Sequence, residues 1–384
     1  MSPVVVRSAL VYGGPMEVAG DVGRLRNVLG IEAPILQSGM RGVAGPELAA
    51  AVSNAGGLGI LAALFQSPDD VRADIRTIRR LTDRPFGVNV WLHDDVRTPP
   101  DVERIDSDAV RAVQDVFNKL RPRFELAPTL AGPPQLPALV DAALEVMIEE
   151  RIPVFSAGVG LPEPELVERF HSAGTKVVAM VACVGDAATA ASSGADVVVA
   201  QGAEAGGHRS YGSKLSRGDA TGTGTFSLVP EVVARVGDRV PVVAAGGIVD
   251  GRGLAAAVVL GASGALIGTR FVATAESTAN EVWKRRLVSG HGETVLTDGF
   301  TGQWARVLRS EFTDRWDAAG VDPLPGLLQA AVGADLYTAA VQMGDDQMQA
   351  MYAGASYRRI SDLPTAGDVV RDIVRDATDL LGRL

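Results

Sequence analysis

The chain has 384 residues, more than the roughly 250 of a typical (β/α)8 barrel, so one barrel would leave about a hundred residues for additions. Its formal net charge of −10 is spread over the sequence without a basic run, which argues against nucleic acid as the main partner. No apolar stretch reaches the roughly 18 residues of a membrane span, and the N-terminus lacks the pattern of a signal peptide. We therefore expect a cytoplasmic protein.

Short apolar runs rich in β-branched residues alternate with longer amphipathic segments along most of the chain. Several of these segments begin at Pro or Asp and end at Gly, as helices do, for example residues 46–56, 164–174 and 186–194. Strand and helix patterns that alternate about eight times favour a closed parallel barrel over an open sheet. The predicted strands lie near residues 33–37, 57–61, 86–91, 152–158, 175–182, 195–201, 240–247 and 264–271.

Two regions interrupt this alternation. The connection between the third and fourth strands is long, contains a charged helical pattern and a Pro-rich stretch, and predicts an insertion at about residues 92–135 at the barrel mouth. Helical patterns prevail after residue 275. We therefore expect a barrel domain over residues 1–275 and a helical subdomain over residues 276–384 that covers the active-site face. The amphipathic terminal helix near 366–382 is expected to pack on the barrel, and the tail is a candidate interface for a homodimer.

The ends of the last two predicted strands are rich in glycine. Barrel enzymes build their active sites at the C-terminal ends of the strands, and the loops after strands seven and eight often hold a phosphate group. Glycine lets backbone N–H groups approach a phosphate, and a threonine hydroxyl adds a further donor. This pattern predicts a phosphate-bearing cofactor at Gly246 and Gly247 after strand seven, and at Leu266, Ile267, Gly268 and Thr269 after strand eight.

The loop after the sixth strand carries the strongest signal for catalysis. Gln201 offers an amide to the edge of a heterocycle, and Gly206 and Gly207 allow the backbone to come close to a ligand. His208 places a group that titrates near neutral pH at the barrel mouth, so it is the candidate for acid–base chemistry. The other histidines, His93, His171 and His291, lack a comparable setting. With Cys183 as the single cysteine, disulfides within the chain and a cysteine-based zinc cluster are excluded, and no metal site is predicted.

Three motifs together resemble the nitronate monooxygenase (2-nitropropane dioxygenase) family. They are Pro34-Ile-Leu-Gln-Ser-Gly-Met40, the stretch from Glu47 to Gly59, and the loop from Gln201 to His208. The resemblance covers residues 22 to 275 approximately. A weaker similarity lies at Met351-Tyr-Ala-Gly and the segment after it. It implies a (β/α)8 barrel enzyme that uses flavin mononucleotide (FMN).

The resemblance also implies roles for individual residues. His208 takes the place of the base, which removes the proton beside a nitro group while electrons pass to the flavin and O2 reoxidises it. Gln201 would contact the flavin ring, and Asn89 would hydrogen-bond it. The first strand end, with Gln37, Ser38, Gly39 and Met40, would lie along the flavin. The cofactor chain and phosphate would be held by Gly206, Gly207, Gly246, Gly247 and the run Leu266, Ile267, Gly268 and Thr269.

Departures from the family pattern leave the substrate open. The first strand ends in Gln-Ser-Gly-Met where many members have Gln-Ala-Pro-Met, and Ser210 follows Arg209 where glycine is commoner. A related FMN-dependent reductase or dehydrogenase acting on an acyl-thioester or a quinone with NAD(P)H is therefore the main alternative. A nucleotide dehydrogenase with a catalytic cysteine is disfavoured, because Cys183 lies at the end of the fifth strand. In a non-catalytic flavin- or phosphate-binding protein, His208 would be inert.

Overall fold

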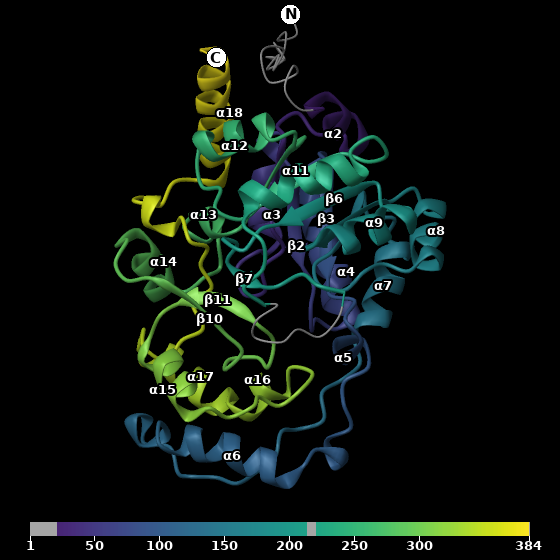
Figure 1. The fold of residues 1–384 in the computed structure, drawn as a ribbon. Coiled ribbons are helices and arrows are strands. Elements are labelled where there is room, and N and C mark those ends of the chain that lie inside the picture. Colours follow the sequence, from purple (N-terminus) through teal and green to yellow (C-terminus); the bar gives the residue numbers. More distant parts are fainter. Residues whose placement is uncertain (1–20, 213–219, 384) are drawn as a thin grey trace, which may run out of the picture.

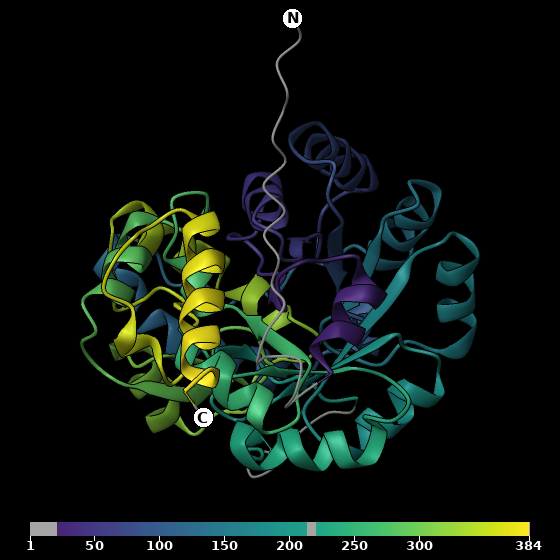
Figure 2. The same ribbon diagram turned by 90° about the horizontal axis from the view of Figure 1, so that it is seen from above.

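Eight parallel strands form a barrel in the computed structural model, which describes residues 21–212 and 220–383 (Figures 1 and 2). The predicted start of the barrel domain and the last residue of the C-terminal segment lie outside the described residues. The barrel strands are β1 (Ile35–Gln37), β2 (Gly59–Ala62), β3 (Phe86–Val90), β4 (Val154–Ala157), β5 (Lys176–Val181), β6 (Val197–Gln201), β8 (Val242–Ala245) and β9 (Gly264–Ile267). All eight coincide with predicted strands, so the predicted barrel is confirmed.

The sheet closes on itself. Its strand order is β1-β9-β8-β6-β5-β4-β3-β2, and the two outer strands meet where Leu36 bridges Leu58. Two backbone hydrogen bonds complete this junction, from Leu58 N to Ile35 O and from Gln37 N to Leu58 O, each 2.9 Å long. Closure removes the exposed sheet edges. Because all the strands are parallel, their carboxyl ends lie on one side of the barrel.

The interior of the barrel is filled with side chains. Valine, leucine and isoleucine side chains from the strands form one buried cluster, and Leu25 and Leu29 of helix α2 (Val22–Leu29) belong to it. Helix α2 begins at Asp21, whose carboxylate accepts a hydrogen bond of 3.0 Å from Arg24 N. This helix plugs the amino end of the barrel, so the barrel is a packed core rather than a pore.

A ring of helices surrounds the strands, as Figure 2 shows from above. The terminal helix α18 completes this ring, because its buried face, including Val370, Ile373 and Val374, packs on α12 and α3. Gly251 permits the close approach, since a Cβ there would lie 2.5 Å from Cβ of Asp376. The prediction that the terminal helix packs on the barrel is confirmed. The helices are α3 (Pro46–Asn54), α4 (Pro68–Leu81), α7 (Val140–Glu149), α8 (Pro164–Ser172), α9 (Val184–Ser192), α11 (Thr225–Val236), α12 (Gly251–Val259), α13 (Thr269–Val272) and α18 (Ala366–Leu381).

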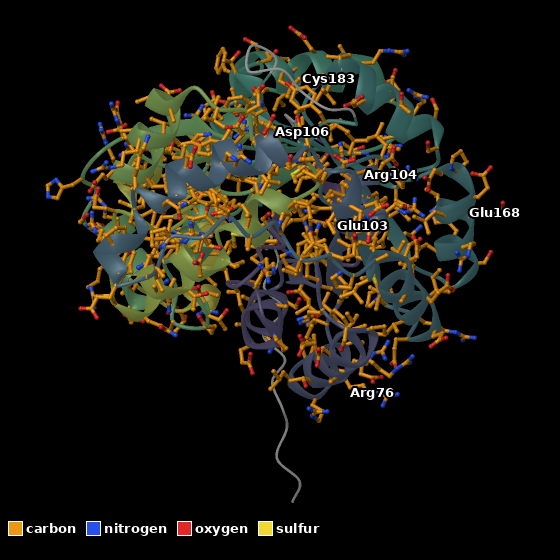
Figure 3. All side chains as sticks on the ribbon, turned by 90° about the horizontal axis from the view of Figure 1, so that it is seen from below. Arg76, Glu103, Arg104, Asp106, Glu168 and Cys183 are labelled. Carbon is orange, nitrogen blue, oxygen red and sulfur yellow. The ribbon has the colours of Figure 1, made fainter. Side chains whose placement is uncertain are left out.

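The insertion and the C-terminal segment fold together into a second unit beside the barrel mouth. In Figure 1, α6 lies beneath α15 to α17, and Figure 3 shows Glu103, Arg104 and Asp106 of the insertion across the end of the molecule nearest the viewer. The two segments share a hydrophobic core that includes Phe117 and Phe312. Their elements are α5 (Asp94–Arg97), η1 (Val102–Arg104), α6 (Ser107–Asn118), η2 (Arg121–Phe124), α14 (Glu281–Val288), β10 (Thr294–Thr297), β11 (Ala305–Leu308), α15 (Glu311–Ala319), α16 (Leu328–Val332), α17 (Ala334–Gln342) and η3 (Tyr357–Arg359).

Two expectations from the sequence need correction. The segment after residue 275 is not wholly helical, since β10 and β11 form an antiparallel hairpin to which β7 (Gly207–His208) adds a third strand. That third strand comes from far away in the sequence, so local periodicity does not reveal it. The predicted eighth strand ends at Ile267 rather than near residue 271, and the short helix α13 follows, because a short apolar run fits either structure.

No helix in the described part of the chain combines the length and the apolar character that a membrane span requires.

A buried arginine joins the insertion to the C-terminal segment. The Arg121 side chain is 1% exposed and its Nε donates to Oδ2 of Asp335 at 3.0 Å. The same guanidinium donates to Gln114 Oε1 at 2.7 Å and to Asn118 Oδ1 at 2.8 Å. Every one of these partners would lose a hydrogen bond if the charge were removed.

We expect Arg121→Met to lower the free energy of unfolding by about 1–3 kcal/mol, because it leaves buried polar groups unpaired while Asp335 stays partly hydrated. The control is Arg111→Met on α6 of the same insertion, since the Arg111 side chain is 63% exposed. That variant should change the stability by less than about 0.5 kcal/mol. Denaturant unfolding followed by circular dichroism measures both, and equal effects of the two substitutions would contradict the assignment.

Candidate active site

A cavity of about 540 Å³ opens at the carboxyl ends of the barrel strands. Its wall is built from strand ends of the barrel, from the hairpin β10–β11 and from helix α16, so both parts of the chain contribute to it. Most of the residues that the sequence singled out meet here. They are Ser38, Gly39, Met40, Asn89, Gln201, Gly206, Gly207, His208, Gly246, Gly247, Leu266, Gly268 and Thr269.

Gln37 and Ile267 do not line the cavity, which corrects their predicted place in the site. Gln37 is fully buried, its Oε1 accepts from Ile60 N at 3.0 Å, and its Nε2 donates to Ile60 O at 3.2 Å. The side chain thus replaces backbone hydrogen bonds between β1 and β2, and its role is to close the barrel. Ile267 is 1% exposed and packs in the core between strands and helices.

A cradle of bare backbone forms one wall of the cavity. A Cβ at Gly206 would lie 2.5 Å from Gly354 N, and a Cβ at Gly246, where φ is +107°, would lie 2.9 Å from Ala205 N. Only glycine fits where three loops approach so closely. The Thr269 hydroxyl accepts from Gly354 N at 3.0 Å, and the hydroxyl-bearing Ser356 also lines this wall. Such a wall suits an anionic phosphate group.

Gly354 and Ser356 were not among the predicted site residues. The one sequence signal for them was the weak motif at Met351-Tyr-Ala-Gly, which lies far along the chain from the barrel loops.

The first strand end packs directly on Asn89. A Cβ at Gly39 would lie 2.5 Å from Cβ of Asn89, so glycine is required at this contact. Asn89 Nδ2 donates to both the carbonyl and the hydroxyl oxygen of Ser156, at 3.0 Å each. The amide nitrogen is therefore occupied by hydrogen bonds within the barrel. The amide oxygen is the polar atom with which Asn89 can contact a ligand.

Gln201 lines the cavity, but both of its polar atoms hold the following loop. Its Nε2 donates to the His208 carbonyl at 2.9 Å, and its Oε1 accepts from Ser210 N at 2.9 Å. Ser210 is fixed in turn, since its hydroxyl donates to Gly158 O at 2.5 Å. Gln201 therefore positions the loop that carries His208, and its contact with a heterocycle stays a prediction.

His208 is half-buried between two aromatic rings. Its ring centroid lies 4.6 Å from that of Trp91 and 5.2 Å from that of Tyr352, and its Nε2 lies 2.9 Å from the hydroxyl oxygen of Thr301. Burial, aided by the positive charge of Arg209, lowers the pKa of His208 to about 3. The imidazole is therefore neutral at physiological pH and can accept a proton. Sequence reasoning missed Trp91, Thr301 and Tyr352, which come from segments distant in the chain.

Two arginines support the loop between β6 and β7. Arg209 is buried and donates to the carbonyl oxygens of Gly202, at 3.2 Å, and Ala205. Arg306 on β11 donates to the carbonyl of Ala203 at 3.0 Å. Burial, then the nearby Arg306 charge, lowers the pKa of Arg209 to about 10, so this group stays a cation near neutral pH. The site therefore carries fixed positive charge behind the glycine cradle.

The outer part of the cavity differs in character. Arg41 is exposed at the rim, with its guanidinium 5.4 Å from the ring centroid of Phe65, and no carboxylate within the described range pairs with it. Beyond the rim the wall is apolar. It is formed by Leu136 and Pro137 near the insertion and by Leu327, Ala330, Ala331 and Ala334 of the C-terminal segment.

Cys183 does not line the cavity. It caps α9, where its sulfur accepts from Asp186 N at 3.4 Å, and burial raises the pKa of its thiol. A cysteine nucleophile at this site is thus not available from Cys183.

The chain is similar to members of one protein family over nearly its whole length. A family model described as nitronate monooxygenase matches residues 23–376. A nitronate monooxygenase from Pseudomonas aeruginosa is 38% identical, over 92% of this chain and 98% of the relative. A probable nitronate monooxygenase from Staphylococcus saprophyticus is 33% identical, over 94% of this chain and 99% of the relative.

Two solved structures also resemble this chain over nearly its whole length. Nitroalkane oxidase from Streptomyces ansochromogenes superposes with a TM-score of 0.83 at 34% identity, covering 94% of this chain and 99% of that one. FabK from Thermotoga maritima superposes with a TM-score of 0.73 at 32% identity, covering 94% and 97%.

The low pKa of His208 predicts how stability depends on pH. Because the pKa is about 3 in the folded protein and roughly 6.5 in an unfolded chain, the unfolded state binds more protons as the pH falls. This residue should therefore reduce the free energy of unfolding as the pH drops from about 6.5 toward 3. Denaturant unfolding at pH 7.5 and at pH 5 gives the free energy of unfolding that is lost between the two pH values. We expect this loss to be smaller for His208→Asn than for the unmodified protein. Identical losses would mean that His208 is not held neutral.

Proposed function

We propose that the chain, which belongs to the nitronate monooxygenase family, is an FMN-dependent enzyme that oxidises alkyl nitronates, with His208 as its base and O2 as the oxidant. One observation carries the proposal. The same cavity contains a glycine cradle suited to a phosphate and a neutral imidazole held between Trp91 and Tyr352.

The residues present fit a flavin mononucleotide. Gly206, Gly246 and Gly354 leave a wall of backbone that side chains would block, and Thr269 and Ser356 add hydroxyl groups for the phosphate. Gly39 and Met40 offer a surface along the first strand end, with the Asn89 amide beside it. When bound there, FMN supplies the electron acceptor that O2 later reoxidises.

His208 can act as a base over the working pH range. Its pKa of about 3 keeps the ring unprotonated, so a lone pair is available for the proton of the carbon beside a nitro group. The same low pKa makes the free imidazole a weak base, so the negative charge that develops on the substrate has to stabilise the imidazolium. A nitronate is the form that has already lost this proton. The imidazole is thus required for a neutral nitroalkane and much less for the nitronate itself.

One observation favours a second candidate. The apolar outer wall, with Leu136, Leu327 and Ala331, extends the cavity beyond the cradle and would accommodate an acyl chain. Reduction of an acyl-thioester or a quinone at the expense of NAD(P)H is therefore the alternative reaction for the same flavin site.

The difference between the two forms of the substrate provides the test. We expect His208→Asn to slow anaerobic flavin reduction by a neutral nitroalkane about 10²- to 10⁴-fold, the range that a general base contributes. Reduction by the corresponding nitronate should fall far less. Stopped-flow absorbance of the flavin measures both rates. An unchanged rate with the nitroalkane would remove His208 from the base role.

Arg41 should attract the anionic substrate to the rim. We expect Arg41→Met to raise KM for a nitronate roughly threefold to tenfold with little change in kcat, because the lost charge acts on encounter rather than on chemistry. The effect should shrink in 1 M salt, where the Debye length falls to about 3 Å. Arg76→Met is the control, since Arg76 lies at the periphery of the molecule in Figure 3 and is 60% exposed. A KM effect that salt does not change would contradict an electrostatic role.

A further inference from the structure

The loop between β10 and β11 places the Thr301 hydroxyl against the imidazole of His208. We propose that Thr301 is a positioning residue that fixes His208 in the tautomer with hydrogen on Nε2, so that Nδ1 is the atom that accepts the proton. This inference rests on the base role of His208 in the proposed function. It adds a residue from the C-terminal segment to the proton-transfer step.

The hydrogen bonds around Thr301 determine whether Thr301 Oγ1 or His208 Nε2 donates the hydrogen in their contact. A hydroxyl has one hydrogen to donate and two lone pairs that accept. Thr301 Oγ1 lies 3.2 Å from the carbonyl oxygen of Gln303, which can only accept, and 3.4 Å from the backbone nitrogen of Gln303, which can only donate. The hydroxyl hydrogen is thus used on the carbonyl. The remaining lone pair must receive hydrogen from His208 Nε2, at 2.9 Å.

The other ring nitrogen is the one left for a substrate. His208 lines the cavity, and its Nδ1 makes no hydrogen bond with any residue in the described ranges. An Nδ1 atom that was both unpaired and fully buried would be one of the buried polar atoms without a partner, and it is not one of them. Nδ1 is therefore open to the cavity. In the opposite tautomer, Nδ1 would carry hydrogen and Nε2 would be blocked by Thr301, and the ring would offer no base.

The arrangement suits both states of the proton transfer. The C–H bond beside the nitro group breaks, its electron pair remains on the substrate as the nitronate, and the proton forms an N–H bond at Nδ1. His208 becomes an imidazolium whose Nε2–H still donates to Thr301. Because Thr301 accepts before and after the step, no hydrogen bond has to reorganise.

Backbone contacts hold Thr301 and His208 in register with each other. His208 pairs with Ala305 of β11, and Arg209 N donates to Trp304 O at 3.0 Å. Gly302 follows Thr301 with φ of +78° and donates to Asp298 O at 2.7 Å. The turn therefore fixes the hydroxyl through the protein itself, independently of any ligand.

Nitrogen NMR of the imidazole rings tests the tautomer directly. The chain has four histidines, so ¹⁵N-histidine labelling of the flavin-loaded protein gives few signals, and His208→Asn identifies the one from His208. We expect an unprotonated Nδ1 and a protonated Nε2 at neutral pH. A protonated Nδ1 in the unmodified protein would overturn the proposal without any variant.

Three variants separate tautomer control from packing. Thr301→Val removes the acceptor at nearly constant shape and should mix or reverse the tautomers, while Thr301→Ser should retain the original spectrum. Thr297→Val is the matched control, because this hydroxyl lies in the same hairpin, accepts from Gly299 N at 3.1 Å and does not touch His208. An unchanged His208 spectrum in Thr301→Val would overturn the assignment.

Kinetics provide the second readout. With a neutral nitroalkane, Thr301→Val should lower kcat roughly tenfold or more, because an imidazole in the wrong tautomer cannot accept the proton. Thr301→Ser and Thr297→Val should stay within about twofold. A kcat loss in Thr301→Val that Thr301→Ser shares would contradict tautomer control. If no nitro compound reduces the flavin of the unmodified protein, the proposed function fails, while the NMR result still decides the assignment of Thr301.

Discussion

The site depends above all on the pairing of β7 with β11. His208 pairs with Ala305 and Gly207 with Arg306, so a two-residue strand after the barrel strand β6 becomes part of a sheet built by the C-terminal segment. Backbone pairing fixes the side on which each side chain lies. This constraint turns the imidazole toward the cavity, and Tyr352, through the bridge from its backbone to Val307, reaches it from the same sheet.

The hairpin also links the site to the rest of the second unit. Val307 of β11 belongs to the same buried core as Phe117 of the insertion and Phe312 of α15. The barrel interior is a separate cluster that α2 closes from the other end. The glycine cradle therefore rests mainly on barrel loops, whereas the surroundings of His208 rest on a core that insertion and tail build together. The long insertion has a structural role in the site without contributing the base.

The sequence predicted those parts of the site that depend on residues close together in the chain. The alternation of apolar runs predicted all eight strands, and the glycines at Gly246, Gly247 and Gly206 predicted the cradle because only glycine fits there. Its failures concern contacts over long distances in the chain. Gln37 looks like a ligand group in the sequence, yet its amide satisfies backbone groups inside the barrel. The partners of His208 could not be found, because the pairing of β7 with β11 is a tertiary event.

The most direct test of the account is anaerobic mixing of the purified protein with propionate-3-nitronate, with NADH and NADPH in parallel, while the flavin absorbance is followed. If the chain is an FMN-dependent nitronate-oxidising enzyme, the protein should show an FMN spectrum before mixing and rapid bleaching by the nitronate, with full recovery when O2 is admitted. Bleaching by a nicotinamide alone, with the nitronate inert, would contradict it and assign the cavity to the reduction of a thioester or quinone.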